Sequence, residues 1–290
     1  MLYNVTTMAT TWHTVATRDV RLLKKQLDIV NGLPKDYVFL NYLRCHDDIG
    51  WGLDYATLQQ EGIEERAHKK YLNDYFQGFA GDSNSRGVLY NEDPVTGDAR
   101  FCGTTASMCG IEKAGFEKDK AAMKKAIQMD VMLHAYMFMQ SGIPVLYSGD
   151  EIGQVNDYSY KNDPDKAPDS RYIHRGAMHW DRAAKCDNPR TVEGQLFRQL
   201  NKMEKIRKSE KAFMTNADTW TVETWDNSVL CIGRYYGGDK IYGLFNFSES
   251  DKTAWINERD GLYKDLITGK VMEAAGVNIP AYGFYWLKKQ

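Results

Sequence analysis

A short apolar run that ends abruptly in charge places the strongest constraint on how this chain can fold. Residues 38–43 are typical of a short buried strand, and Arg44, His46, Asp47 and Asp48 follow it at once. Burying so many ionisable groups is costly unless they are paired or solvated. The strand end is therefore either a local ion-pair network or a functional site, because parallel barrels carry catalytic groups where their strands end.

A second unit of the same kind lies near the middle of the chain. Residues 118–140 predict the strongest helix, with a Met-rich apolar face that we interpret as core filler. Residues 143–148 then predict a buried parallel strand that ends in Asp150 and Glu151. Together with a helix predicted over 5–30, helix and strand alternate twice. This alternation is typical of an α/β fold with a parallel sheet.

Two long polar segments interrupt this pattern. The first, about 48–117, contains one predicted helix at 63–78 and then many turn-forming residues. The second, 152–190, is rich in Asp, Asn and Pro, and its acidic residues do not have the spacing of an EF-hand loop. Long loops inside compact domains are usually functional or disordered. An amphipathic helix is predicted over 192–210, after which the hydrophobic period changes from helical to alternating.

The C-terminal 80 residues are predicted to be all β. Short alternating runs separated by Asp, Asn and Gly turns predict a β-sandwich. The predicted strands are 219–225, 228–235, 240–246, 266–270 and 280–287. We therefore predict two domains, an α/β part over 1–210 and a β-sandwich over 211–290.

Composition narrows the classes of partner and compartment. The formal net charge of −2 argues against a nucleic-acid partner, which would require a basic surface. The five Cys are scattered without metal-ligand spacing, so we interpret them as free thiols in a reducing, cytoplasmic setting. The most apolar stretch, 131–148, is too interrupted to span a membrane, and no signal peptide is visible at the N-terminus. No metal or cofactor is predicted.

Four phrases, in order, resemble glycoside hydrolase family 13, the α-amylase family, and within it the amylosucrase branch. Residues 41–51, Asn-Tyr-Leu-Arg-Cys-His-Asp-Asp-Ile-Gly-Trp, are similar to the seventh barrel strand, and residues 146–151 to the eighth. Residues 93–104 resemble part of the insertion after strand seven, and residues 168–175 resemble an Asp-Ser-Arg-x-x-His-Arg stretch. The resemblance implies the C-terminal part of a (β/α)8 barrel, with strands seven and eight, followed by a β-sandwich.

The resemblance also implies roles for individual residues. Asp47 would stabilise the transition state at the sugar ring, and His46 would donate to a ring hydroxyl. Arg171 would close the bottom of the glucosyl pocket; the local alternative is that it only pairs with Asp169. Asp48 and Arg100 would face the acceptor. Where amylosucrases often carry another acceptor-side Arg, this chain has Lys69.

Two catalytic groups of the family have no counterpart in the sequence. Retaining glycoside cleavage needs a carboxylate nucleophile and a carboxylic acid about 5 Å apart. The family places them after strands four and five, and neither phrase is found here, so the chain is expected to begin after strand six. We expect this chain alone to be inactive. The parent chemistry would be glucosyl transfer from sucrose or an α-glucoside to α-glucan or water.

Other interpretations stay open at this point. The chain could be a non-catalytic carbohydrate-binding module, or one that self-associates through open sheet edges. A separately made N-terminal half could also complement it. The sequence does not distinguish amylosucrase from sucrose hydrolase or α-glucosidase.

Overall fold

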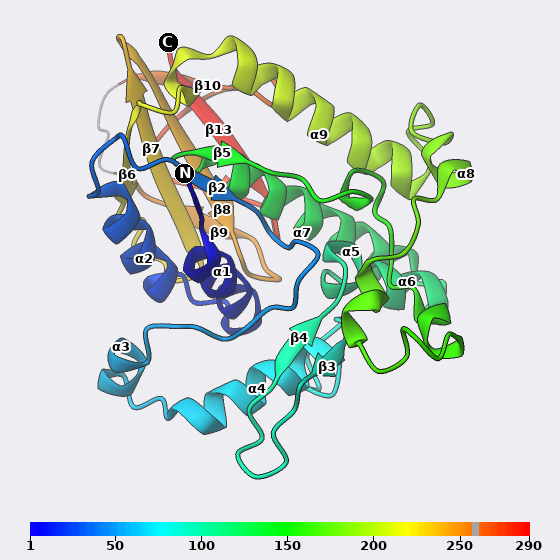
Figure 1. Ribbon diagram of the computed structural model, residues 1–290. Coiled ribbons are helices and arrows are strands. Elements are labelled where there is room, and N and C mark those ends of the chain that lie inside the picture. Colours follow the sequence, from blue (N-terminus) through cyan, green and yellow to red (C-terminus); the bar gives the residue numbers. More distant parts are fainter. Residues whose placement is uncertain (257–260) are drawn as a thin grey trace.

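The computed structural model describes residues 1–256 and 261–290 and confirms the predicted fold class. An α/β part with a parallel sheet is followed by an antiparallel β part (Figure 1). The α-helices are α1 Val5–Thr17, α2 Arg21–Asn31, α3 Tyr55–Gln60, α4 Glu65–Gln77, α5 Thr105–Met108, α6 Ile111–Glu117, α7 Lys120–Met139, α8 Trp180–Ala183 and α9 Val192–Ser209. None of these helices is long and apolar enough to cross a membrane.

The strands form four sheets in the described ranges. A parallel sheet has the order β1-β2-β5, and a six-stranded antiparallel sheet has the order β11-β10-β13-β8-β7-β6. Two antiparallel pairs, the β3-β4 hairpin and the β9-β12 pair of non-consecutive strands, complete the set. The strands are β1 Leu2–Tyr3, β2 Phe39–Asn41, β3 Val88–Tyr90, β4 Arg100–Cys102, β5 Ile143–Pro144, β6 Asp218–Val222, β7 Val229–Tyr236, β8 Asp239–Asn246, β9 Lys252–Ala254, β10 Leu262–Asp265, β11 Val271–Glu273, β12 Val277–Ile279 and β13 Phe284–Lys289.

The parallel sheet differs from the prediction in strand number and length. Besides the two predicted strands, the sheet contains β1, which pairs in parallel with β2. A strand of two residues is too short to show an alternating pattern in the sequence. The predicted strand over 143–148 is wrong beyond its first residues. After β5, Val145 still donates to the Asn41 carbonyl at 2.8 Å, and a turn follows in which the Asp150 N–H bonds the Tyr147 carbonyl. This early turn brings Asp150 to the end of the sheet.

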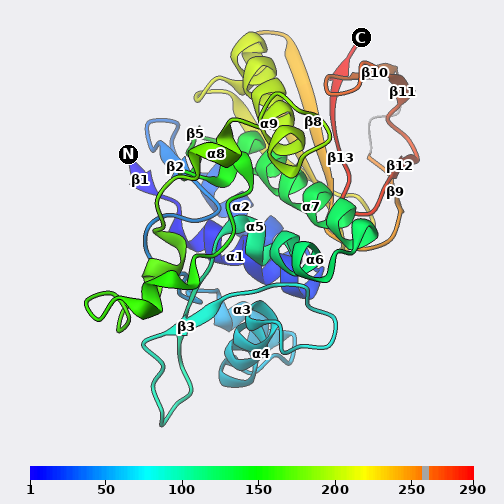
Figure 2. The same cartoon turned by 90° about the vertical axis from the view of Figure 1, so that its right-hand side faces the viewer.

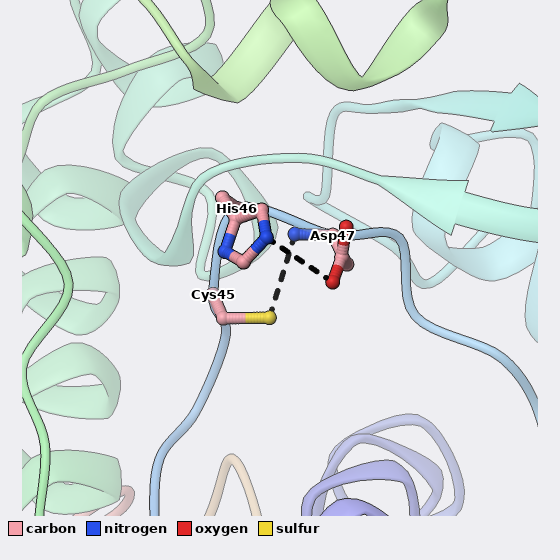
Figure 3. A group of neighbouring side chains, drawn as sticks. All are labelled: Cys45, His46 and Asp47. Atoms are coloured by element: carbon pink, nitrogen blue, oxygen red, sulfur yellow. Dashed lines mark hydrogen bonds and ion pairs between the residues drawn. The ribbon is translucent and has the colours of Figure 1, made fainter.

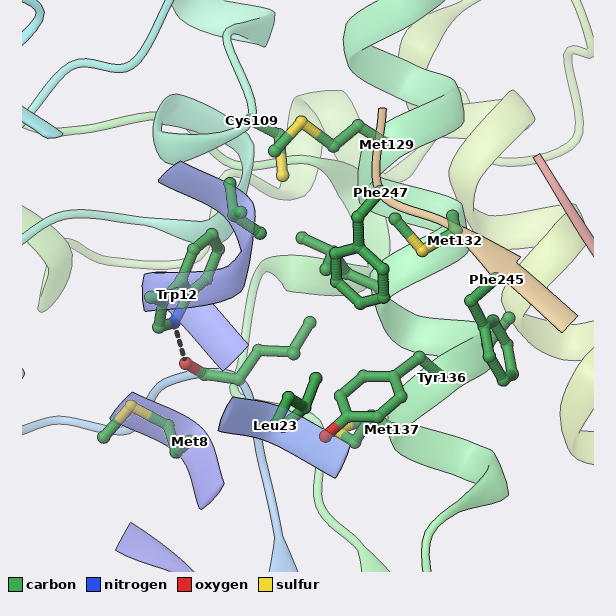
Figure 4. Packing of buried hydrophobic residues seen from close by; sticks show 14 of the residues in the cluster. Met8, Trp12, Leu23, Cys109, Met129, Met132, Tyr136, Met137, Phe245 and Phe247 are labelled. Atoms are coloured by element: carbon green, nitrogen blue, oxygen red, sulfur yellow. Dashed lines mark hydrogen bonds between the residues drawn. The ribbon is translucent and has the colours of Figure 1, made fainter. Parts of the chain in front are cut away.

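The predicted single helix over 5–30 is in fact two helices. Arg18 has φ 57° and ends α1 with a left-handed cap whose N–H bonds the Thr14 carbonyl. The indole of Trp12, fully buried on α1, donates to the Leu43 carbonyl at 2.7 Å (Figure 4). Helix α1 thereby fixes the backbone immediately before the charged strand end.

Helix α7 is the centre of the hydrophobic core, as its apolar face predicts. Met132, Tyr136 and Met137 on α7 lie between α1–α2 on one side and Phe245 and Phe247 of the β part on the other (Figure 4). A Cβ at Gly243 on β8 would come within 2.9 Å of Met139, so only glycine allows this close approach of sheet and helix. One core therefore runs through both the α/β part and the antiparallel sheet.

Two arginines, the buried Arg234 and the half-buried Arg207, cap the C-terminus of α7. Arg234 on β7, with no exposed surface, donates to the carbonyls of Ala212, Met139, Gln140 and Met214 at 2.7 to 3.0 Å. Arg207 on α9 donates to the carbonyls of Phe138 and Gly142. Burial lowers the pKa of Arg234 to about 9, which still leaves it charged at neutral pH. A cation is favourable at this end of a helix dipole.

The β part has a smaller second layer than a full sandwich. One face of the six-stranded sheet packs on α7, and the other packs on the two-stranded β9-β12 pair. The predicted strand at 266–270 is wrong, because these residues form a turn in which the Gly269 N–H bonds the Asp265 carbonyl. The buried Asp265 carboxylate accepts hydrogen bonds from Thr268 in this turn. The residues predicted as a strand are therefore turn residues.

The first polar segment is more ordered than predicted. The predicted helix at 63–78 is confirmed as α4, but the segment also contains α3, α5, α6 and the β3-β4 hairpin (Figure 2). Helix α5 is one turn long and α3 and α6 are under two turns, so their hydrophobic periods are too short to detect. The hairpin packs against the 3-10 helix Ser170–His174 in the second polar segment.

Two buried histidines connect α1 to α4, and from them we predict that the stability of the fold decreases in acid. His13 Nδ1 and His68 Nε2 lie 2.9 Å apart, and burial together with His68 lowers the pKa of His13 to about 3. Burial also lowers the pKa of His68. Both folded pKa values lie below the unfolded value, so stability is fully present above about pH 6.5 and is lost as pH falls below it.

We therefore expect the free energy of unfolding to fall by up to about 1.4 kcal/mol per pH unit for each of these histidines. Urea unfolding at a series of pH values measures this slope. In His68→Gln the slope below pH ~6.5 will be shallower, whereas His179→Gln, which replaces an exposed imidazole, will keep it. Equal slopes in all three proteins would contradict the prediction.

Candidate functional site

The charged strand end after β2 is anchored by a buried ion pair. Arg44 Nε lies 2.8 Å from Asp150 Oδ1, and both side chains are at most 3% exposed. The guanidinium also lies 4.5 Å from the ring centroid of Tyr147 and bonds the His174 carbonyl at 3.4 Å. Arg44 follows β2 and Asp150 follows β5, so this pair joins the ends of two parallel strands. The ion-pair network that the sequence left as one alternative is thus present, directly beneath the candidate site.

The second polar segment holds the backbone of the next residues. The His46 carbonyl accepts from Arg175 Nε at 2.6 Å and from His174 Nε2 at 3.2 Å. Burial, and then the charge of Arg44, lower the pKa of His174 to about 4, so the ring is neutral at physiological pH. Since a carbonyl only accepts, the proton of this neutral ring is on Nε2. The backbone of His46 is therefore fixed while its side chain stays 65% exposed.

The Asp47 carboxylate divides its two oxygens between different partners. Oδ2 lies 3.4 Å from His46 Nε2 (Figure 3). Oδ1 lies 3.5 Å from Arg175 Nη2 and 3.7 Å from Arg171 Nη1. The Asp47 side chain is 52% exposed. The structure thus brings the predicted residues His46, Asp47 and Arg171 together at the end of the parallel sheet.

Arg171 also makes the local contact that the sequence left as an alternative. Its guanidinium bonds Asp169 through Nε at 2.9 Å and Nη2 at 2.8 Å, and it lies 4.8 Å from the ring centroid of Tyr90. The hydrogen bond from Arg171 lowers the pKa of Asp169. Asp169 and Tyr90 therefore orient Arg171 from two sides, and its Nη1 remains directed toward Asp47.

The acceptor-side residues separate into two groups. Asp48 is 7% exposed and pairs with Arg100 Nη1 at 3.3 Å. Lys69 is placed elsewhere: on α4, within the described ranges, it pairs with Glu65 at 2.9 Å and Asp98 at 3.4 Å. The β3-β4 hairpin thus brings Arg100 to Asp48, while Lys69 does not join the cluster around Asp47.

Several residues of this cluster were not singled out from the sequence. Arg175 contacts both His46 and Asp47, and its only sequence signal was its place four residues after Arg171 in the same phrase. Tyr90 carried no signal, because it lies in the segment of turn-forming residues. The Arg44–Asp150 pair links residues 106 positions apart, a contact that no local pattern reveals.

The arrangement suits recognition of hydroxyl groups more than bond cleavage. A carboxylate, an imidazole and two guanidinium groups offer acceptors and donors at fixed positions, which matches the alternating donors and acceptors of a sugar ring. Asp48 and Asp169 are each paired with an arginine. Within the described part of the chain, the cluster therefore offers hydrogen-bonding and charged groups that a polar ligand could meet.

Comparisons with known proteins extend this description. No family model matches the chain. Glucosylglycerate phosphorylase from Escherichia coli (strain K12) is 24% identical over 160 residues, which are 54% of this chain and 28% of that protein. Sucrose 6F-phosphate phosphorylase from Thermoanaerobacter thermosaccharolyticum superposes with a TM-score of 0.62 at 16% identity, over 97% of this chain and 48% of that one. AmyP in complex with maltose gives 0.62 at 14% identity, over 99% and 49%.

The chain has the fold of about half of each of these two matched proteins, an α/β region with a parallel sheet followed by an antiparallel sheet. It spans 28% of the curated relative and about half the length of the two matched structures. At these identities the structural matches establish the architecture only.

Proposed function

We propose that this chain is the C-terminal part of an amylosucrase-like enzyme of glycoside hydrolase family 13, acting on sucrose or α-glucosides. Asp47 binds ring hydroxyls and strengthens its hold as the ring flattens in the transition state, and His46 donates to a neighbouring hydroxyl. Arg171 closes the base of the glucosyl pocket. Asp48 and Arg100 face the acceptor or leaving group, whereas Lys69, which pairs with Glu65 and Asp98, takes no part in the site.

One observation carries the proposal: Asp47 lies between His46 on one carboxylate oxygen and Arg171 on the other. These residues come from phrases more than 120 positions apart, and each phrase resembles the family at the matching place. The Asp47 and His46 side chains are both more than half exposed. Their exposure leaves them free to meet a ligand.

The nucleophile and the acid come, in this proposal, from strands that pair with the open edges of the parallel sheet. The edge strands β1 and β5 are two residues long, and Leu2, Tyr3 and Ile143 on them are 55%, 67% and 37% exposed. An exposed edge strand presents unpaired N–H and C=O groups that can pair with a further strand. A segment that adds parallel strands there would bring its own strand ends to the same rim as His46 and Asp47.

Saccharide binding to the chain itself tests the assignment. The sequence has six His, so imidazole proton NMR can follow His46 individually. We expect sucrose or maltose at tens of millimolar to shift the His46 signals, and Arg171→Ala to weaken this shift strongly. Arg190→Ala, which removes an exposed guanidinium in another loop, will leave it unchanged. The absence of any His46 shift, or a full shift in Arg171→Ala, would contradict the proposal.

A self-associating carbohydrate-binding module is the second candidate, and the same exposed edge strands favour it. Unpaired strand edges are ready templates for another chain. Light scattering over a range of concentrations distinguishes the two. A concentration-dependent dimer that Ile143→Lys disperses supports self-association, whereas a monomer at every concentration excludes it.

A further inference from the structure

The residues Cys45, His46 and Asp47 form a cluster of potential metal ligands. One ligand atom of each, a sulfur, a ring nitrogen and a carboxylate oxygen, all lie within 4.8 Å of one another (Figure 3). It is the single group of three or more such residues found in the described part of the chain. We propose that it binds a borderline divalent transition-metal ion, with Zn²⁺ as the reference ion.

The donor set selects the class of ion. Thiolate and imidazole ligands suit Zn²⁺ and its neighbours, while Mg²⁺ and Ca²⁺ require six or more oxygen ligands. Three protein ligands with a fourth position open to water form the usual arrangement of an exchangeable zinc site. The cluster offers three such ligands on a surface that solvent reaches, since the His46 and Asp47 side chains are 65% and 52% exposed.

The distances are already close to those of a bound ion. Zinc bonds of about 2.0–2.3 Å in a tetrahedron place ligand atoms roughly 3.3–3.7 Å apart. His46 Nε2 and Asp47 Oδ2 are 3.4 Å apart, within that range. Cys45 Sγ accepts from the Asp47 N–H at 3.4 Å, which holds the sulfur on the same side of the loop. The His46 and Asp47 side chains, both more than half exposed, can rotate toward the half-buried sulfur of Cys45.

The neighbouring arginines leave the ligand oxygen available. Arg171 and Arg175 both face Asp47 Oδ1, whereas Oδ2 is the oxygen directed at His46. A carboxylate that accepts from a cation through one oxygen and binds a metal through the other is a common supported ligand. The backbone is fixed as well, because Arg175 and His174 hold the His46 carbonyl.

Binding changes the protonation of one ligand. The Cys45 thiol gives up its proton to solvent as the metal–sulfur bond forms, so binding releases a proton and tightens as pH rises. If the proposed function holds, the ion occupies the same side chains that contact the sugar. Zinc and saccharide would then exclude each other at this site.

Titration of the chain with Zn²⁺ and with Co²⁺ tests the inference directly. Calorimetry should give one equivalent of Zn²⁺, and Co²⁺ should give a thiolate-to-metal absorption band. Cys45→Ser should abolish the band and weaken Zn²⁺ binding at least tenfold, and His46→Gln should weaken it similarly. Cys186→Ser, which changes the other half-buried cysteine, is the matched control and should bind normally.

Circular dichroism and the melting temperature of each variant confirm that it is folded. Full-strength Zn²⁺ binding in Cys45→Ser, or no stoichiometric binding by the unaltered chain, would overturn the inference. Adding maltose separates it from the proposed function. If zinc binds and maltose does not weaken the binding, the metal site is supported and the sugar role is contradicted. If saccharide binds and zinc does not, the sugar role is supported and the metal site is contradicted.

Discussion

Replacing Asp150 with Ala will destabilise the chain by about 3–5 kcal/mol, the largest loss we expect from removing one side chain. Arg44 is 2% exposed, and its guanidinium would remain buried without its carboxylate partner. Taking a charge out of water without pairing it is costly, and the low-dielectric surroundings do not compensate. The loss should also disorder the loop of His46 and Asp47, because the pair holds the ends of β2 and β5 together.

Urea unfolding measures this loss, and a double substitution separates its causes. Arg44→Met with Asp150→Leu removes both charges and should cost less than Asp150→Ala alone, because no charge is left buried and unpaired. Asp163→Ala breaks a surface pair with Lys166 at 2.8 Å and should change the stability little, because water screens exposed ion pairs. An Asp150→Ala loss as small as that of Asp163→Ala would show that the buried pair does not hold the strand ends.

The second large effect is on catalysis. In an enzyme that joins this chain to a segment with the nucleophile and the acid, Asp47→Asn will lower kcat about 10²-fold or more. The amide keeps the shape of the carboxylate but loses the charge that stabilises the developing positive charge on the ring. Arg100→Ala will instead chiefly change KM or the ratio of transfer to hydrolysis, because Arg100 pairs with Asp48 away from Asp47.

Steady-state kinetics with sucrose, combined with product analysis, distinguishes these outcomes. An unchanged kcat in Asp47→Asn would refute the assignment of the strand end, while Arg198→Ala on the exposed face of α9 serves as a neutral control. This chain alone should show no turnover. Turnover of sucrose by residues 1–290 would refute the proposed division of catalytic groups.

Long periodic elements could be predicted from the sequence, and short ones could not. The predicted helices at 118–140 and 192–210 correspond to α7 and α9, because several turns of apolar residues give a clear period. β1 and β5 have two residues each, and their pairing with β2 depends on contacts far apart in sequence. The break at Arg18 was missed because a left-handed cap on a non-glycine residue gives no compositional signal.

The sequence indicated some residues of the candidate cluster, but not the contacts between them. The charged strand end pointed to His46 and Asp47, and the resemblance pointed to Arg171, which the fold places 3.7 Å from Asp47. The supporting contacts of Arg175, His174 and Tyr90 depend on how two long polar segments fold over the strand ends. Lys69 was grouped with Arg100 by resemblance, yet the direction of α4 gives it other partners, Glu65 and Asp98.

The arginine caps on α7 have a consequence for how the protein unfolds. Arg207 lies before the predicted boundary at 210 and Arg234 after it, and both satisfy carbonyls at the same helix end. Separating the two parts at that boundary would leave those carbonyls without hydrogen-bond donors. It would also expose the face of α7 that the antiparallel sheet covers. Calorimetry should accordingly record one melting event rather than two, and neither piece should be recoverable on its own.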